Sequence, residues 1–185
     1  MNECVNLQKH RFWRNGAQVF FLLFLSLPLT SIFSDTTNGK NLEDDPCFSA
    51  DQQLGDSAFW AVTAVNLYNE KEYSKAVAVV DACFGKWGPD AGHQQKKLLD
   101  EKVKCPPIGR VNRQDRLSID RDYLMNDVSF ALWVKARSLD ELGKIEMAKI
   151  AYAQCLYMTC GRVWDVNGWF WSPAEDCIKY ARKLL

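Results

Sequence analysis

The chain has 185 residues, of which 48% are hydrophobic and 25% are charged. This composition is that of an ordinary globular protein and excludes an intrinsically disordered chain. Lysine plus arginine and aspartate plus glutamate each number 23, so no excess of positive charge indicates nucleic-acid binding. The length is sufficient for a targeting segment and one domain with a buried core.

Residues 1–34 have the layout of a secretory signal peptide. Lysine and arginine residues give a positively charged start, and an apolar run follows at 19–29. This run is shorter than the roughly 20 residues that a membrane-spanning helix needs. We therefore expect cleavage near Ser34, and the alternative is an uncleaved anchor in the inner membrane. Residues 35–46 are polar and acidic, which predicts a flexible leader.

Loss of the signal would remove Cys4 and leave an even number of cysteines, which export allows to form disulfides. The remaining cysteines are Cys47, Cys83, Cys105, Cys155, Cys160 and Cys177. The sequence alone does not choose among their pairings. One candidate is a bridge from Cys160 to Cys177, because it would join an aromatic turn to the closing helix. Cys83 and Cys155 occupy small-residue positions on two helices, where buried free thiols are the expectation.

Residues 47–185 are predicted to form an all-α domain of helical hairpins. Ser57 is expected to cap a first helix at 58–69, and a short turn leads to a second helix at 73–84. The apolar positions of the second helix follow the spacing i, i+3, i+4, i+7, i+8, which places them on one helix face. They are Ala76, Val79, Val80, Cys83 and Phe84.

The same apolar stripe returns 72 residues later (148 − 76 = 72), after a turn at Gly143. Its members are Ala148, Ala151, Tyr152, Cys155 and Leu156. Helical repeats of about 34 residues do not lie 72 residues apart. We therefore expect an insertion at about 86–125. It should hold a helix capped by Asp90, a break at Cys105-Pro106-Pro107, a helix capped by Asn112, and a kink near Asn126.

The C-terminal part begins with an aromatic turn that contains Asn167-Gly168, a dipeptide typical of tight turns. Ser172, Pro173 and Glu175 then have the spacing of a capping box with proline at the first helical position. This pattern predicts a closing helix that covers the open end of the second helix pair.

The two helix pairs resemble the tetratricopeptide (TPR) family. In the first pair the family's tryptophan, glycine, alanine and phenylalanine positions are held by Trp60, Ala64, Ala76 and Val80. In the second pair the same four positions are held by Leu132, Ala136, Ala148 and Tyr152, and Leu139 holds the family's tyrosine position. Thr63 and Lys135 depart from the family's leucine. Segments 105–109, 126–128 and 164–175 are similar to a group of bacterial exported TPR-like proteins that have no assigned activity. The resemblance implies an α-α superhelix and export.

The first helices of TPR units form the concave face, and the resemblance transfers this role to residues 58–69 and, in the second pair, to the helix near residues 130–141. The residues carried over are Phe130, Trp133, Arg137, Asp140 and Glu141. An aromatic ring, a cation and two carboxylates suit a peptide or protein partner. The alternative is a solvated helix face with pairs four residues apart, such as Arg137 with Glu141.

The aromatic turn carries Trp164, Trp169 and Trp171, whose flat rings could stack on sugars or on a partner's side chains. The alternative is that these rings only pack the turn against the helices. No catalytic, metal-binding or cofactor-binding pattern is visible, since His93 is the only histidine after the signal and is expected on an exposed helix. Two hypotheses follow. The first is a periplasmic or secreted adaptor that binds another protein, and the second is a binding protein or hydrolase directed at carbohydrate or peptidoglycan.

Overall fold

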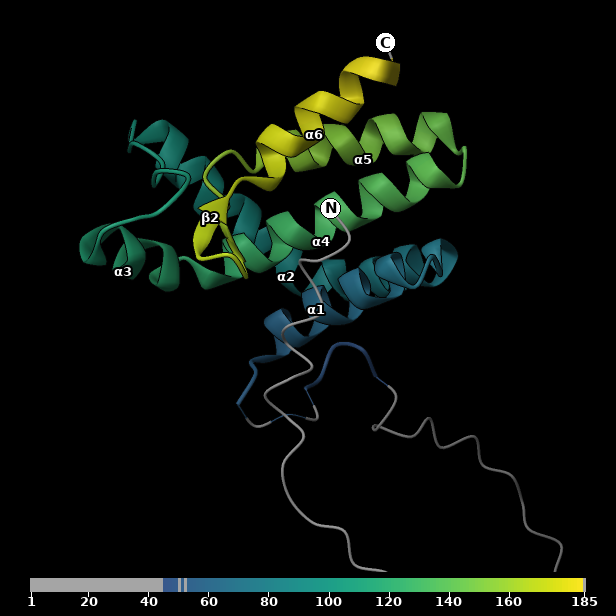
Figure 1. Ribbon diagram of the computed structural model, residues 1–185, viewed down its shortest axis with the longest axis horizontal. Coiled ribbons are helices and arrows are strands. Elements are labelled where there is room, and N and C mark those ends of the chain that lie inside the picture. Colours follow the sequence, from purple (N-terminus) through teal and green to yellow (C-terminus); the bar gives the residue numbers. More distant parts are fainter. Residues whose placement is uncertain (1–44, 50, 52, 185) are drawn as a thin grey trace, which may run out of the picture.

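The computed structural model describes residues 45–49, 51 and 53–184, so the predicted signal and most of the predicted leader lie outside the described residues. The described chain is mostly helical with one small hairpin, which confirms the predicted all-α class (Figure 1). Its elements are α1 (Asp56–Asn69), α2 (Tyr73–Asp100), α3 (Arg113–Arg121), α4 (Tyr123–Glu141), α5 (Ile145–Tyr157), β1 (Val163–Asp165), β2 (Trp169–Trp171), α6 (Pro173–Ala181) and a closing 3₁₀ turn, η3 (Arg182–Leu184). Over these ranges, none of the helices is long and apolar enough to cross a membrane.

Two antiparallel helix pairs, α1–α2 and α4–α5, form the core, and α4 packs against α1, α2, α5 and α6. The predicted stripes face inward, since Ala76 and Ala148 are both 0% exposed. Trp60 is fully buried as well, and its indole N–H donates to the carbonyl of Val79 across the first pair at 2.8 Å. The burial of both stripes is therefore confirmed, and the TPR type of the pairs stays a prediction.

The predicted break after residue 84 is wrong, because α2 continues to Asp100 with Pro89 inside it. A proline inside a helix costs about 3 kcal/mol, since it removes one hydrogen bond and crowds the preceding turn. Buried side chains before and after Pro89 compensate for this cost. Trp87 is buried with its ring centroid 5.0 Å from that of Trp60, and Ala91 is fully buried. Gln95 is fully buried too, and its side-chain oxygen accepts the backbone N–H of Cys160 at 2.9 Å.

Two of the four predicted helix caps are confirmed, and the cap predicted at Asp90 is wrong because Asp90 lies inside α2. Asn112 accepts the N–H of Asp115 at 2.9 Å, and Ser172 accepts that of Glu175 at 3.3 Å. Ser57 does not cap α1, whose N-cap is Gly55; the Ser57 hydroxyl instead donates to the carboxylate of Asp127 on α4 at 2.6 Å.

The kink expected near Asn126 lies at Asp122, between α3 and α4. Asn126 lies inside α4 and joins two segments, since its side chain donates to the carbonyl of Ile119 and accepts the N–H of Arg162.

Asp127 gives the fold a specific pH dependence. Burial raises the pKa of Asp127 to about 6, against 3.8 for an ordinary aspartate, while the hydrogen bond from Ser57 acts in the opposite direction. The folded state therefore binds more protons than the unfolded state between these values, and its stability rises as the pH falls from 7 towards 4. Replacing Asp127 with asparagine should stabilise the protein by about 3 kcal/mol near pH 7.5 and by only about 1 kcal/mol near pH 4.5. Urea unfolding of both proteins at the two pH values measures this, and an equal difference at both values would contradict it.

Three disulfides staple the fold: Cys47–Cys83, Cys105–Cys160 and Cys155–Cys177. The predicted bridge from Cys160 to Cys177 is wrong. Cys177 lies on the buried side of α6, which packs against α5 and so meets Cys155, whereas Cys160 follows α5 and meets the loop that holds Cys105. The expectation of free thiols at Cys83 and Cys155 is also wrong, because both residues form disulfides. Their predicted burial is confirmed, since both are fully buried. Three bridges indicate an oxidising, extracytoplasmic compartment.

Candidate binding surface

The aromatic turn is a β-hairpin that presents different tryptophans on its two faces. Trp164 pairs with Phe170 and Asp165 with Trp169 across the strands. Because side chains alternate along a strand, Trp169 and Trp171 share one face of the hairpin and Trp164 lies on the other. The tight turn uses Gly168 at φ +97°, where only glycine is unstrained.

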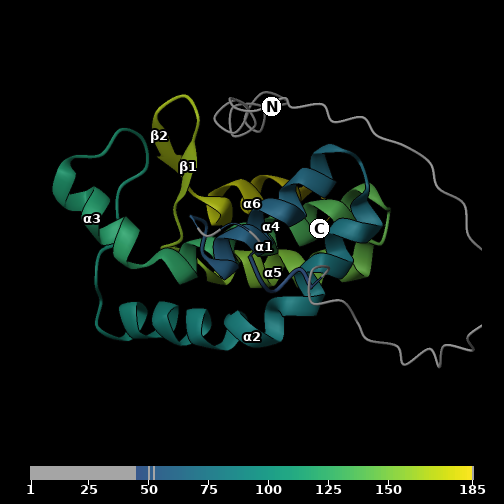
Figure 2. The same cartoon turned by 90° about the horizontal axis from the view of Figure 1, so that it is seen from below.

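The loop before α3 holds the hairpin in place. Gly109 and Phe170 exchange both backbone hydrogen bonds, at 2.8 and 2.9 Å. The buried guanidinium of Arg162 donates to the carbonyls of Pro106, Thr159 and Gly161, and the Cys105–Cys160 bridge lies beside it. Figure 2 shows the hairpin projecting from the side of the helical body that lies opposite α2. The predicted insertion thus supports the hairpin.

Five rings from three elements form what we call the aromatic face. They are Tyr68 of α1, Phe130 and Trp133 of α4, and Trp169 and Trp171 of β2. Ring centroids of Trp133 lie 5.5 Å from those of both Tyr68 and Trp171, and the Phe130 ring lies 6.0 Å from Trp133 and 5.9 Å from Trp171. Trp169 is two residues before Trp171 on β2 and therefore lies on the same face of the hairpin. The face therefore crosses from α1 over α4 to the hairpin.

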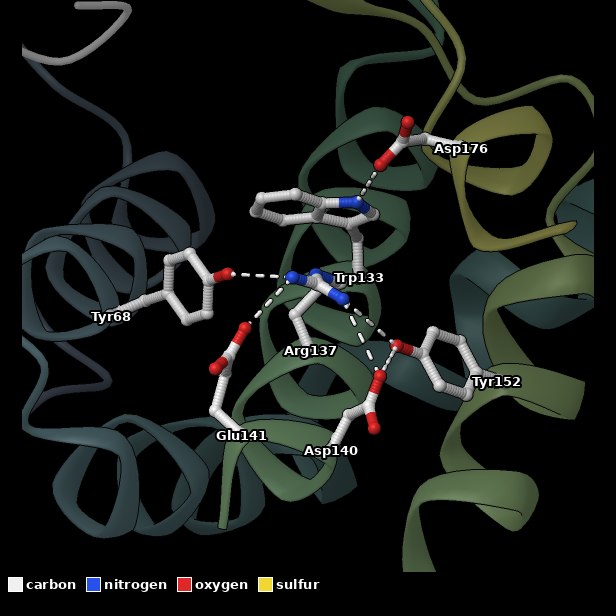
Figure 3. Close-up of polar contacts among 7 residues, drawn as sticks. All are labelled: Tyr68, Trp133, Arg137, Asp140, Glu141, Tyr152 and Asp176. Atoms are coloured by element: carbon white, nitrogen blue, oxygen red, sulfur yellow. Dashed lines mark hydrogen bonds and ion pairs between the residues drawn. The ribbon is translucent and has the colours of Figure 1, made fainter. Parts of the chain in front are cut away.

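Trp133 is fixed in the middle of the aromatic face (Figure 3). Its indole N–H donates to Asp176 of α6 at 2.8 Å, and the other oxygen of Asp176 accepts from Lys179 at 3.2 Å. The Asp176 carboxylate therefore has partners on both oxygens. A ring held by its polar edge loses little side-chain freedom when a ligand packs against it.

Arg137 lies one helical turn after Trp133, in a network that joins four helices (Figure 3). Its guanidinium donates to Glu141 at 2.9 Å, to the hydroxyl of Tyr68 at 3.3 Å and to Asp140 at 3.4 Å. Burial alone would lower the pKa of Arg137, but the hydroxyls of Tyr152 and Tyr68 raise it above its ordinary value. The guanidinium also stacks on the ring of Tyr180 of α6, 3.5 Å from its centroid.

Arg137 is only 7% exposed, so its side chain contacts neighbouring helices and is not available to a partner. Asp140 is partly buried and accepts the hydroxyl proton of Tyr152 at 2.8 Å, so it too is engaged within the protein. Glu141 is exposed, and its pairing with Arg137 is the one that the helical spacing suggested. Phe130 and Trp133 are the two aromatic residues among the α4 residues predicted to bind a partner, and both are partly exposed.

The predicted tryptophans divide between two surfaces. Trp169, at 39% exposure, and the partly buried Trp171 belong to the aromatic face together with the α4 residues. Trp164, at 47% exposure, turns away from it, and its ring lies 5.0 Å from the guanidinium of Arg116 on α3. Sequence reasoning did not find Asp176 or Tyr180; their spacing of four on the closing helix was the available signal that they share a face.

The described residues contain one group of His, Cys, Asp or Glu side chains close enough to share a metal ion, namely Asp45, Cys47 and Cys83. The two cysteines are bonded to each other and so offer no thiolate to a metal. His93 is exposed on α2, as predicted.

A second surface lies on the other side of α4, where α2, α4 and α5 line an open apolar groove of about 400 Å³. Gly88 and Gly92 form its α2 wall, and Ile150, which is 65% exposed, stands on its α5 wall. Gln154 and the hydroxyl of Tyr157 are the polar side-chain groups in the lining, and that hydroxyl donates to the carbonyl of Gly92.

Comparison of the chain with protein-family models, with curated proteins and with solved structures found no match.

Proposed function

We propose that this protein is a non-catalytic adaptor of TPR-like type that binds a segment of another protein along the aromatic face. Residues 1–34 direct its export in this proposal, and it acts in the bacterial periplasm or outside the cell. The three disulfides support this location, since such bridges persist in oxidising compartments.

One observation carries the proposal: Trp169 is 39% exposed on the same face of the disulfide-anchored hairpin as Trp171, whose ring packs on Phe130 and Trp133. Tryptophan and tyrosine dominate the residues that supply binding energy at interfaces. The disulfide Cys105–Cys160 and the Gly109–Phe170 hydrogen bonds hold the hairpin before any ligand arrives. Binding then costs little ordering of the loop.

Binding of carbohydrate or peptidoglycan is the second candidate, and the exposed ring of Trp169 favours it. Sugars stack on open, flat ring faces. Phe130 and Trp133 stack at 27°, but the ring plane of Trp171 meets those of Trp133 and Phe130 at 75° and 86°, so the three rings together form an angled surface and not one flat platform. The geometry thus supports a peptide more than a glycan.

Affinity capture from native envelope extracts tests the adaptor function, with the exported, disulfide-bonded protein as bait. We expect Trp169→Ala to weaken capture of its protein partner about tenfold or more, because an anchoring tryptophan contributes about 2 kcal/mol or more to binding. The matched control is Trp164→Ala, which removes a tryptophan of similar exposure from the opposite face of the hairpin. Equal capture by both variants would contradict the proposed site.

A further inference from the structure

We propose that the segment bound by the aromatic face is a neutral, proline-rich stretch in the polyproline II conformation. This inference rests on the proposed function and specifies the chemistry of the partner. It is carried by three properties of the face: the angles between its rings, the balance of its charges and the hydrogen-bond donors left on its surface.

The angles between the rings create notches along the face. Tyr68 and Trp133 meet at 64° and Trp133 and Trp171 at 75°, with centroids 5.5 Å apart in both pairs. A notch between tilted rings accepts a compact apolar ring such as that of proline. A polyproline II helix has three residues per turn and so presents side chains on the same side at every third position. Such a segment can fill successive notches while it stays extended.

The charged groups beside the face are already paired with one another within the protein. Arg137 lies between Asp140 and Glu141, at 3.4 and 2.9 Å, and Asp176 is paired with Lys179. A charged ligand would have to displace these pairs to gain a counter-ion. Lys183 of η3 is exposed and lies 4.9 Å from the ring of Tyr180, which is not one of the five rings of the aromatic face. The face therefore matches a segment without charge.

Two indole N–H groups of the face are hydrogen-bond donors without a partner among the described residues, whereas the hydroxyl of Tyr68 accepts from Arg137. The indole N–H groups of Trp169 and Trp171 make no hydrogen bond with any of the residues that the structure describes, whereas that of Trp133 is engaged by Asp176. A polyproline II segment exposes backbone carbonyls that have no internal partner, and its prolines carry no N–H that needs an acceptor. Donors on the protein and acceptors on the ligand are complementary.

Titration of the exported, disulfide-bonded protein with four probes tests the inference by tryptophan fluorescence and calorimetry. The probes are a neutral peptide of repeated Pro-x-x-Pro, the same peptide with alanine for each proline, a lysine-rich peptide and an N-acetylglucosamine oligomer. We expect micromolar binding of the proline peptide and at least tenfold weaker binding of the other three. Trp169→Ala should weaken proline-peptide binding about tenfold, and Trp164→Ala should leave it unchanged. Trp171→Phe keeps an aromatic ring and removes one donor, so a several-fold loss is expected.

Equal binding of the proline and alanine peptides, or no binding of the proline peptide, would overturn the inference. The adaptor function would survive either result if envelope capture still depends on Trp169 and not on Trp164. Tighter binding of the N-acetylglucosamine oligomer with the same dependence on Trp169 would overturn the inference and favour the carbohydrate function. Tighter binding of the lysine-rich peptide would overturn the inference and show that the face selects positive charge.

Discussion

Replacing Arg137 with leucine is expected to lower the free energy of unfolding by about 3 kcal/mol. Removing one partner from a buried ionic network typically costs 3–5 kcal/mol, because the remaining charges lose their counter-ion. The lower end applies here, since the Glu141 side chain is 40% exposed and water can solvate it. Leucine cannot replace the bonds to Tyr68 and Asp140 or the stack on Tyr180, so contacts between α4 and its neighbouring helices weaken together.

Two further variants make this expectation specific. Arg137→Lys keeps the charge but cannot reach several acceptors at once, so it should recover only part of the lost stability. Lys149→Ala removes an exposed ion pair with Glu146 on α5 and should change stability by no more than about 0.5 kcal/mol. Urea unfolding monitored by circular dichroism measures all three. If Arg137→Leu were as mild as Lys149→Ala, the network would not be what joins the helices.

Removing the Cys105–Cys160 bridge by changing both cysteines to serine is expected to cost about 4 kcal/mol. The bridge closes a sequence separation of 55 residues, and cross-linking over that separation removes much of the unfolded chain's entropy. It also fixes the loop whose Gly109 bonds to Phe170, so its loss should release the hairpin. Amide hydrogen exchange of Gly109 and Phe170 should speed up, and binding at the aromatic face should weaken with it.

The matched control is the Cys47–Cys83 bridge, which has a sequence separation of 36 residues and joins α2 to the segment before α1. Its removal should cost nearly as much stability, about 4 kcal/mol, and leave exchange in the hairpin unchanged. Thermal unfolding together with exchange measured by mass spectrometry separates the two effects. Equal exchange at Gly109 in the two variants would show that the Cys105–Cys160 bridge does not hold the hairpin.

Local sequence patterns predicted the parts of the fold that depend on local physics. The stripes around Ala76 and Ala148 could be located because a period of 3.6 residues marks a buried helix face. Asn112 and Ser172 could be assigned as caps because their side chains bond to backbone three residues away. The turn predicted at Gly143 is present, and the φ of Gly143 is 67°, a value that glycine adopts without strain.

Tertiary contacts determined the features of the fold that local sequence patterns did not predict. Pro89 reads as a helix breaker, but the burial of Trp87 and Ala91 against the core keeps α2 intact. Ser57 was predicted to cap α1, but its hydroxyl donates to the carboxylate of Asp127, 70 residues away in the sequence. The cysteine pairing depends on which helix faces which, and periodicity contains no such information.

In the candidate site, too, local patterns predicted some features and tertiary contacts determined the others. Trp133 and Arg137 could be placed on one helix face from their spacing of four. The sequence did not reveal that Arg137 is buried, since that depends on hydroxyls from α1 and α5 and a ring from α6. Nor did it separate Trp164 from Trp169 and Trp171, because the strand register decides which face each one takes.

Hydroxyl-radical footprinting of the protein, free and in complex with the partner captured from native envelopes, tests the central claim most directly. Oxidation of each tryptophan, read by mass spectrometry, reports whether its ring is covered. The aromatic face as the binding site predicts strong protection of Trp169 and Trp171 and unchanged oxidation of Trp164. Protection of Trp164 alone, or of none of the three in a complex that forms, would contradict it.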